Sequence, residues 1–366
     1  MRAPFEFLLV GGATIFLFPL AWLCRRVFGL DASEYAVGFL TFHAAHLIND
    51  PHFAVTYLLF YRGARRRALG GELKGVQRAR YWAAGLAVPL LLAAWCGAAL
   101  ASGSGRALGW LTQLMFFLVG WHYSKQAFGV LTVLSARRGV RLTEGERRAF
   151  LAHSLAGWAY AWASPADPGR EVEEKGVVYT TLAHGPGLEL ATMVAFDLTA
   201  AAVIFALLGR MRRGEPLPPA AALLGFLVSV WIWTVFTGLD PLMVYLIPAL
   251  HSIQYLYFVA LLRRNEALAE EGPPIFGRPA RERLALLALG AIGLGWLLFH
   301  GAPALLDGWR AARLPRVVLL TGELGPTPWL AALVAAVNIH HYAMDAVIWR
   351  RENPETRFLM DRPVEV

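Results

Sequence analysis

The chain has 366 residues, of which 57% are hydrophobic and 16% are charged, and its mean hydropathy is +0.47. Soluble domains carry about 25% charged residues, so this composition excludes an ordinary soluble domain and predicts a polytopic membrane protein. The net charge of +8 is explained by membrane topology and by attraction to the anionic lipids of the bilayer, and we expect no nucleic-acid partner.

Several apolar runs reach the ~20 residues that cross a bilayer core. They predict an all-α bundle of about ten transmembrane helices in a single transmembrane domain, residues 1–366. The first run is too long for a signal-peptide core and lacks a cleavage site, so we expect it to be a transmembrane helix. In the second, Pro51 follows Asn49 and Asp50, and we expect a kink there. In chain order, the expected spans cover approximately residues 5–24, 34–62, 82–102, 107–136, 149–165, 188–209, 219–236, 242–262, 284–301 and 327–349.

The basic residues predict how this bundle is oriented. If the N-terminus is cytoplasmic, the inner face holds most of the Arg and Lys residues, whereas all loops of the opposite face together hold only eight. The positive-inside rule therefore predicts a multi-pass integral membrane protein with both termini in the cytoplasm. The basic inner segments are residues 62–81, 137–148, 210–218 and 263–283, and the C-terminal tail with Arg350, Arg351, Arg357 and Arg362.

Two of the expected spans carry the same short polar pattern. In "HAAHLIND", His43, His46 and Asp50 stand at i, i+3 and i+7, which places them on one stripe of a helix. In "NIHHYAMD", the pattern [His/Asn]-x-x-His-x-x-x-Asp returns with His341 and Asp345. Polar groups are expensive in hydrocarbon and usually face the bundle interior. Both stripes therefore predict a buried functional site.

Histidines gather at one expected depth of the bundle. Six of the ten histidines fall near the middle of four different spans, and at 1.5 Å per residue their heights spread over only about 9 Å. Gln126 and Gln254 accompany two of them at helical spacing. Side-by-side packing of these four spans would bring the histidines into one site. The six are His43, His46, His122, His251, His340 and His341.

Imidazole together with carboxylate suits iron, zinc, copper or manganese. Four to six histidines with two aspartates exceed the needs of one tetrahedral zinc ion, so we expect a divalent transition metal, with iron as the leading candidate, as one or two ions. All of the six except His340 are expected ligands. His340 points about 100° away from His341, so it is either a sixth ligand or a structural donor. At the catalytic centre, Asp50 and Asp345 would orient or bridge, supported by Gln126 and Gln254.

This pattern resembles the broad class of integral-membrane, histidine-cluster non-haem iron oxygenases and desaturases. The resemblance covers the four histidine-bearing spans and rests on the six histidines with Asp50 and Asp345. It implies a metal-dependent oxidoreductase that acts on a lipid or another lipophilic small molecule. Because the sequence contains no GxGxxG, P-loop or CxxCH motif, any electrons that the reaction needs would come from a separate donor protein. Desaturases carry HxxxH and HxxHH boxes near the cytosolic ends of helices. Here the pairs are HxxH and HH at mid-membrane, which favours a substrate that enters the bilayer core.

Two other functions use the same residues. A proton or metal-ion transporter would employ the intramembrane His and Asp residues as a relay, and it would be expected to contain broken helices and inverted repeats. A non-catalytic membrane assembly factor would use the cluster only as a polar core that joins helices.

The sequence predicts the roles of the remaining polar residues less sharply. We interpret His52 as a reserve ligand that faces away unless Pro51 turns it back. His153, His184 and His300 lie near span ends or in a loop, so we expect them to be solvated. Intramembrane Asp197 and Lys125 are possible partners, and Cys24 and Cys96 form no metal or redox pattern.

The orientation is testable with topology reporters. A reporter fused after Arg362 and one inserted near Gly75 should both be cytoplasmic, whereas one near Gly169 should lie on the opposite side. An external signal at either of the first two positions would refute the ten-span arrangement.

Overall fold

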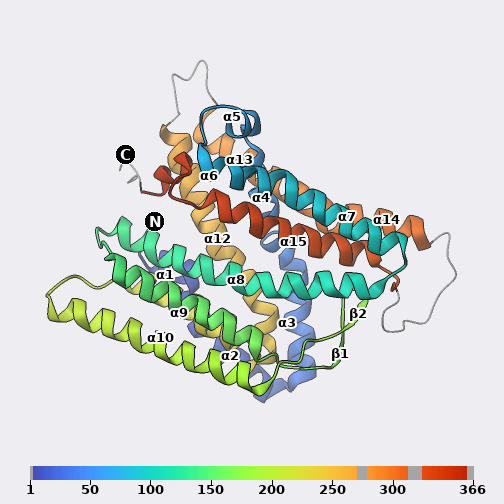
Figure 1. Cartoon of the computed structure of the whole chain (residues 1–366), viewed down its shortest axis with the longest axis horizontal. Helices are drawn as coiled ribbons and strands as arrows, with labels where there is room; N and C mark the ends of the chain where they lie inside the picture. Colours follow the sequence, from blue (N-terminus) through green and yellow to red (C-terminus); the bar gives the residue numbers. More distant parts are fainter. Residues whose placement is uncertain (1–2, 270–277, 312–323, 361–366) are drawn as a thin grey trace.

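The structure is a computed structural model that describes residues 3–269, 278–311 and 324–360, and Figure 1 shows a helical bundle with one small hairpin. The expected helical membrane bundle is confirmed in this part of the chain. In the hairpin, strand β1 (Glu171–Glu174) pairs antiparallel with strand β2 (Val177–Thr180), and Glu171 lies opposite Thr180.

The helices follow the apolar runs closely, and several contain a short π-helical or 3₁₀ segment, labelled η. In chain order they are α1 (Ala3–Phe7), η1 (Leu8–Gly12), α2 (Ala13–Phe28), α3 (Leu30–Ala45), α4 (Asn49–Tyr61), α5 (Ala64–Ala68), α6 (Gly75–Trp82), η2 (Ala83–Ala87), α7 (Val88–Ala101), α8 (Gly105–Arg137) and α9 (Glu144–Ala163). After the hairpin come α10 (Pro186–Arg212), α11 (Ala220–Leu227), η3 (Val228–Val235), η4 (Thr237–Leu239), α12 (Pro241–Ala269), α13 (Ala280–Trp296), η5 (Leu297–Gly301), α14 (Ala302–Ala311), α15 (Pro328–Ile348) and η6 (Pro354–Leu359).

Within the described residues, six helical runs are long and apolar enough to cross a membrane, which indicates a multi-pass integral membrane protein. Helices α8 and α9 occupy the expected spans 107–136 and 149–165 but lie outside this set, and Ala220–Val235 is apolar but shorter. The number of ten spans therefore stays a prediction. The six runs are Pro4–Phe28, Gly75–Ala101, Pro186–Arg212, Pro241–Ala269, Ala280–Arg310 and Pro328–Ile348.

The kink expected at Pro51 is confirmed, and it breaks the second expected span in two. Helix α3 ends at Ala45, and α4 begins at Asn49, so Pro51 lies in the first turn of α4. Proline lacks an N–H donor, and its ring would clash with the carbonyl four residues earlier, which belongs to Leu47. The helical phase is therefore lost between His46 and Asp50, and the stripe inferred from a continuous helix does not persist.

The four helices α4, α8, α12 and α15 meet in the middle of the bundle (Figure 1). Helix α15 packs against both α4 and α8, while α12 packs against α4. Helix α13 covers the other side of α4 and approaches it closely at Gly295, where an added Cβ atom would lie 2.7 Å from the Asp50 carbonyl. These contacts bring the polar residues of four distant segments together.

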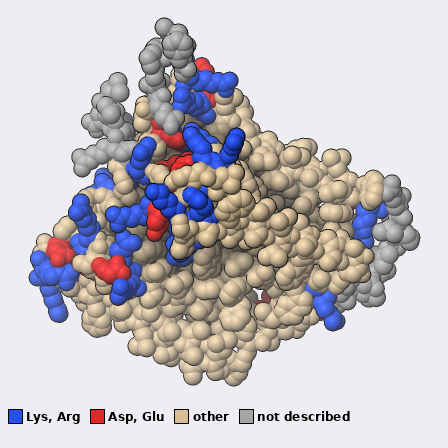
Figure 2. Space-filling view, turned by 45° about the horizontal axis from the view of Figure 1, so that its top comes forward, with Lys and Arg blue, Asp and Glu red and all other residues tan. Residues whose placement is uncertain are grey.

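Charged side chains gather at the end of the bundle where both chain ends lie, while most of the remaining surface in view is uncharged (Figures 1 and 2). Within this end, Arg210 at the end of α10 forms a buried ion pair with Glu146 of α9 at 2.7 Å. Thr143 and Glu146 also cap the start of α9 reciprocally. The charge asymmetry expected from the loops is therefore present, whereas the side of the membrane that this end faces stays a prediction.

The close approach of α13 to α4 yields a matched pair of substitutions. Gly295→Ala should lower the free energy of unfolding by about 1–3 kcal/mol, because the new methyl group overpacks against Asp50. Gly293→Ala, in the same helix, meets nothing within 4 Å and should be neutral or slightly stabilising. Thermal unfolding in detergent measures both, and equal unfolding temperatures would contradict the contact.

Candidate metal centre

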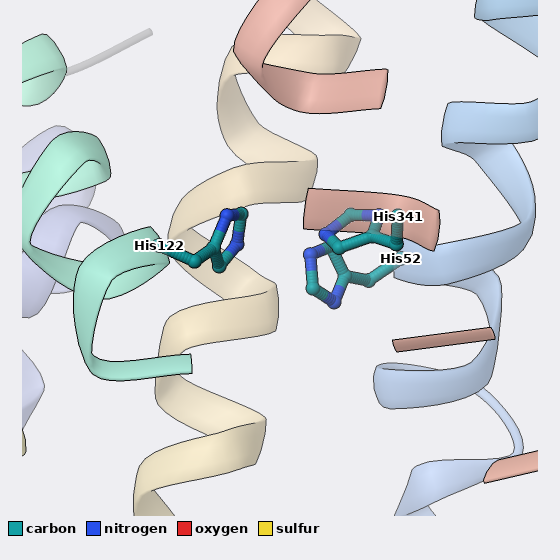
Figure 3. Close-up of side chains that lie close together, drawn as sticks. All are labelled: His52, His122 and His341. Atoms are coloured by element: carbon teal, nitrogen blue, oxygen red, sulfur yellow. The ribbon is translucent and has the colours of Figure 1, made fainter. Parts of the chain in front are cut away.

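The structure divides the expected single site into two groups of possible metal ligands. The central group consists of His52 on α4, His122 on α8 and His341 on α15, whose side chains are all buried and converge in Figure 3. In this group, one nitrogen of each ring lies within 4.8 Å of those of the other two. The second group contains His46, Asp50 and His300, and we describe it after the central group.

The protonation of His52 follows from its neighbours. The Ser252 hydroxyl donates to Asn49 Oδ1 at 3.0 Å and lies 3.1 Å from His52 Nδ1. Because the single hydroxyl proton is already used, Ser252 must accept a hydrogen bond from His52 Nδ1–H. A neutral imidazole protonated at Nδ1 carries its lone pair on Nε2, which is buried and has no hydrogen-bond partner among the described residues. In this tautomer His52 can bind a metal through Nε2.

His341 and Asp345 provide further free ligand atoms. Neither ring nitrogen of His341 has a hydrogen-bond partner in the described part of the chain, and the side chain is fully buried. Tyr255 donates to Asp345 Oδ1 at 2.7 Å. The other carboxylate oxygen, Oδ2, is left 3.3 Å from His341 Nε2 and 3.8 Å from His122 Nδ1. The aspartate is therefore anchored on one side and free on the side of the histidines.

His251 on α12 extends the central group. Its Nε2 atom lies 3.1 Å from His122 Nε2, and its ring stacks on Tyr123 with centroids 4.1 Å apart. Its Nδ1 atom has no partner among the described residues. His251 therefore joins the cluster as a neighbour of His122.

The two glutamines connect helices just outside the cluster. Gln126 donates to Gln254 Oε1 at 2.8 Å and to the His251 carbonyl at 3.3 Å, and Gln254 donates to the Val10 carbonyl in η1. These bonds tie α8, α12 and η1 together. Gln126 and Gln254 thus position the helices that carry His122 and His251, and their geometry assigns them no direct contact with a metal.

The free atoms of the central cluster are the strongest sign of a ligand. A buried polar group without a hydrogen bond costs about 1–3 kcal/mol, and such groups are rare in native structures unless an ion or water satisfies them. Imidazole nitrogens and a carboxylate oxygen from three helices are a donor set that a transition metal satisfies. In the described residues these atoms are His52 Nε2, His251 Nδ1, His341 Nδ1 and Nε2, and Asp345 Oδ2.

The expected ligand His43 and the adjacent histidine of His341, His340, lie outside both ligand groups. His43 is exposed on α3 and packs edge-on against Phe39, away from the central group. His340 is buried, but its Nδ1 atom lies 3.1 Å from the Tyr57 hydroxyl and its Nε2 atom 3.0 Å from the Ala84 carbonyl. Both ring nitrogens of His340 thus have hydrogen-bonding neighbours, and its role as a ligand stays a prediction.

The second group lies at the break between α3 and α4, where His46 follows the end of α3 and Asp50 stands in the first turn of α4. His300, in η5, is 2.8 Å from Asp50 Oδ2 and stacks on the His46 ring with centroids 4.2 Å apart. The expectation that His300 is solvated was wrong, because Gly295 lets α13 approach Asp50 closely. Asp50 and His46 are therefore partners of His300 and are separated from His341.

His153 is also buried rather than solvated. It lies between Thr199 and Trp231, whose ring N–H donates to His153 Nε2 at 3.0 Å. His184 is half-buried against Trp162. Neither belongs to a ligand group among the described residues.

A cavity of about 1370 Å³ adjoins the central group. His122, Gln126, Tyr342 and Asp345 line one part of it, and its wall continues to residues beyond the end of α15. Lys125 also lines the cavity and forms no ion pair with Asp197 within the described residues. The histidine cluster is thus buried but borders a space large enough for a small molecule.

Comparison with protein-family models, curated proteins and solved structures found no match for the chain. The site is therefore interpreted from its own geometry.

The hydrogen bond that orients His52 can be removed selectively. Ser252→Ala should weaken metal binding about 10–100-fold, because the proton on His52 Nδ1 loses its acceptor. Ser124→Ala is the matched control, since that buried hydroxyl on α8 has no hydrogen-bond partner among the described residues. Competition with a chelator measures both affinities, and equal values for the two variants would contradict the assignment of the tautomer.

Proposed function

We propose that this chain is a membrane-bound, metal-dependent oxidoreductase that holds iron at the central histidine cluster and acts on a lipophilic substrate. The observation that carries the proposal is the convergence of free, buried ligand atoms from His52, His341 and Asp345 beside a cavity. His122 would complete the ligand set, and His251 would either bind directly or hold His122 in place.

The composition of the cluster favours this chemistry. Three imidazoles with one carboxylate and no thiolate match the ligands that iron accepts in non-haem centres. Bound iron would supply the capacity to activate oxygen, and the surrounding apolar helices would exclude water. Tyr255 would hold Asp345 in a fixed orientation through its hydrogen bond at 2.7 Å.

The remaining expectations complete the proposal. The bundle would cross the membrane ten times with both termini in the cytoplasm. Electrons would come from a separate donor protein, because the sequence contains no GxGxxG, P-loop or CxxCH motif for a bound nucleotide or covalent haem.

The second ligand group favours one alternative, a proton or metal-ion transporter. His46, Asp50 and His300 meet at the helix break, and Asp50 stands two residues before the central ligand His52 on α4. Helix breaks next to ion sites are common in transporters. Transport would require both groups, whereas the oxidoreductase requires only the central one.

Adjacent histidines of α15 provide the decisive pair of variants. His341→Ala should abolish bound metal, because it removes a ligand with two free nitrogens. His340→Ala should retain metal, although it loses its contacts with Tyr57, Tyr61 and Ala84 and should unfold at a lower temperature. Elemental analysis and thermal unfolding of protein purified from membranes measure both properties.

Three results would contradict the proposal. One is wild-type protein without stoichiometric metal, and the second is equal metal loss in both variants. The third is metal uptake into vesicles that depends on His300 and Asp50, which would support the transporter.

A further inference from the structure

The wall of the cavity is strongly basic away from the histidines. Six basic side chains but only two carboxylates, Asp345 and Glu352, line the cavity. Tyr255 and the histidines surround Asp345, so it does not neutralise these cations. The basic residues are Lys125, Arg141, Arg147, Arg350, Arg351 and Arg357.

None of these six forms an ion pair with a carboxylate in the part of the chain that the structure describes. This contrasts with neighbouring basic residues outside the cavity, since Arg67 pairs with Glu355, and Arg210 pairs with Glu146. Cations that share one cavity repel each other, and this repulsion is relieved when an anion binds between them. The cavity is therefore complementary to a negatively charged ligand.

Of the six cations, Lys125 on α8 and Arg350, just past the end of α15, are the nearest in sequence to residues of the histidine cluster. Lys125 follows His122 by three residues, and Arg350 follows Asp345 by five. The two cationic groups lie within electrostatic range of each other. Three residues of α-helix correspond to about 4.5 Å along the axis. An anion held between Lys125 and Arg350 would thus lie about one helical turn from the proposed metal ligands.

The rest of the wall is apolar and aromatic. Trp121, Phe128, Val133, Phe258 and Trp349 line the same cavity. A small inorganic anion would leave these surfaces and most of the 1370 Å³ without contacts. An acyl chain would cover them, and each CH₂ group that it buries contributes about 0.8 kcal/mol.

We propose that the cavity binds an amphiphile with a single apolar chain and a carboxylate or phosphate headgroup, which Lys125 and Arg350 hold beside the histidine cluster. This inference rests on the proposed function, because it names the class of substrate for the same site. The outer arginines, Arg141, Arg147 and Arg357, would attract the anion to the cavity from the basic end of the bundle.

Equilibrium binding to chelator-treated protein in an uncharged detergent tests the proposal without requiring metal. Oleate should bind at least about tenfold more tightly than monoolein, which has the same chain without the charge. Lys125→Gln and Arg350→Gln should each weaken oleate binding about tenfold and leave monoolein binding unchanged. Arg65→Gln and Arg212→Gln are matched controls, since both arginines are exposed and lie outside the cavity wall.

Three outcomes overturn the proposal. Equal affinity for oleate and monoolein would remove the role of the charge. Acetate or inorganic phosphate that binds as tightly as oleate would identify a free anion as the ligand. Equal losses in the control variants would attribute binding to the basic surface. Oleate binding that persists in a protein without metal affinity would refute the proposed function while leaving this inference intact.

Discussion

The central site depends on one hydrogen bond, in which His52 Nδ1–H donates to Ser252. It determines which ring nitrogen of His52 remains free, and it joins α4 to α12 in the middle of an apolar bundle. In such surroundings a polar atom without a partner is costly, so the free nitrogens of His52 and His341 require a compensating ligand. A bound metal ion would supply that compensation and hold α4, α8 and α15 together, which would make the proposed cofactor part of the fold as well as of the chemistry.

Residues around the histidine cluster position its side chains and its helices. Tyr255 orients Asp345, and the pair Gln126–Gln254 ties the helices that carry His122 and His251. At the break between α3 and α4, His46 and Asp50 meet His300 instead of the central histidines, so the described residues form two small ligand groups rather than one large one. The adjoining cavity connects the central group to a basic end of the molecule, which is consistent with a substrate that is apolar along most of its length and charged at one end.

Helical spacing predicted the parts of this site that lie on continuous helices. His122, His341 and Asp345 lie on α8 and α15, which run unbroken through the site, and the structure brings them together as the sequence indicated. His52 was given a minor role because it does not share a helical face with Asp50, and only the loss of phase before Pro51 turns it inward. His300 carried no signal of its own, since its contact with Asp50 depends on how closely Gly295 lets two distant helices approach. The prediction that His43 is a ligand also assumed one continuous helix. The break between α3 and α4 removes that basis, and the His43 side chain is exposed.

The most direct test of the central claim is anomalous X-ray scattering at the iron absorption edge from crystals of the wild-type protein. The account predicts one anomalous peak among His52, His122 and His341, at about 2.1 Å from their coordinating nitrogens, which is typical of metal–imidazole bonds. A metal-containing protein with no peak at this position, or with a peak only among His46, Asp50 and His300, would contradict it.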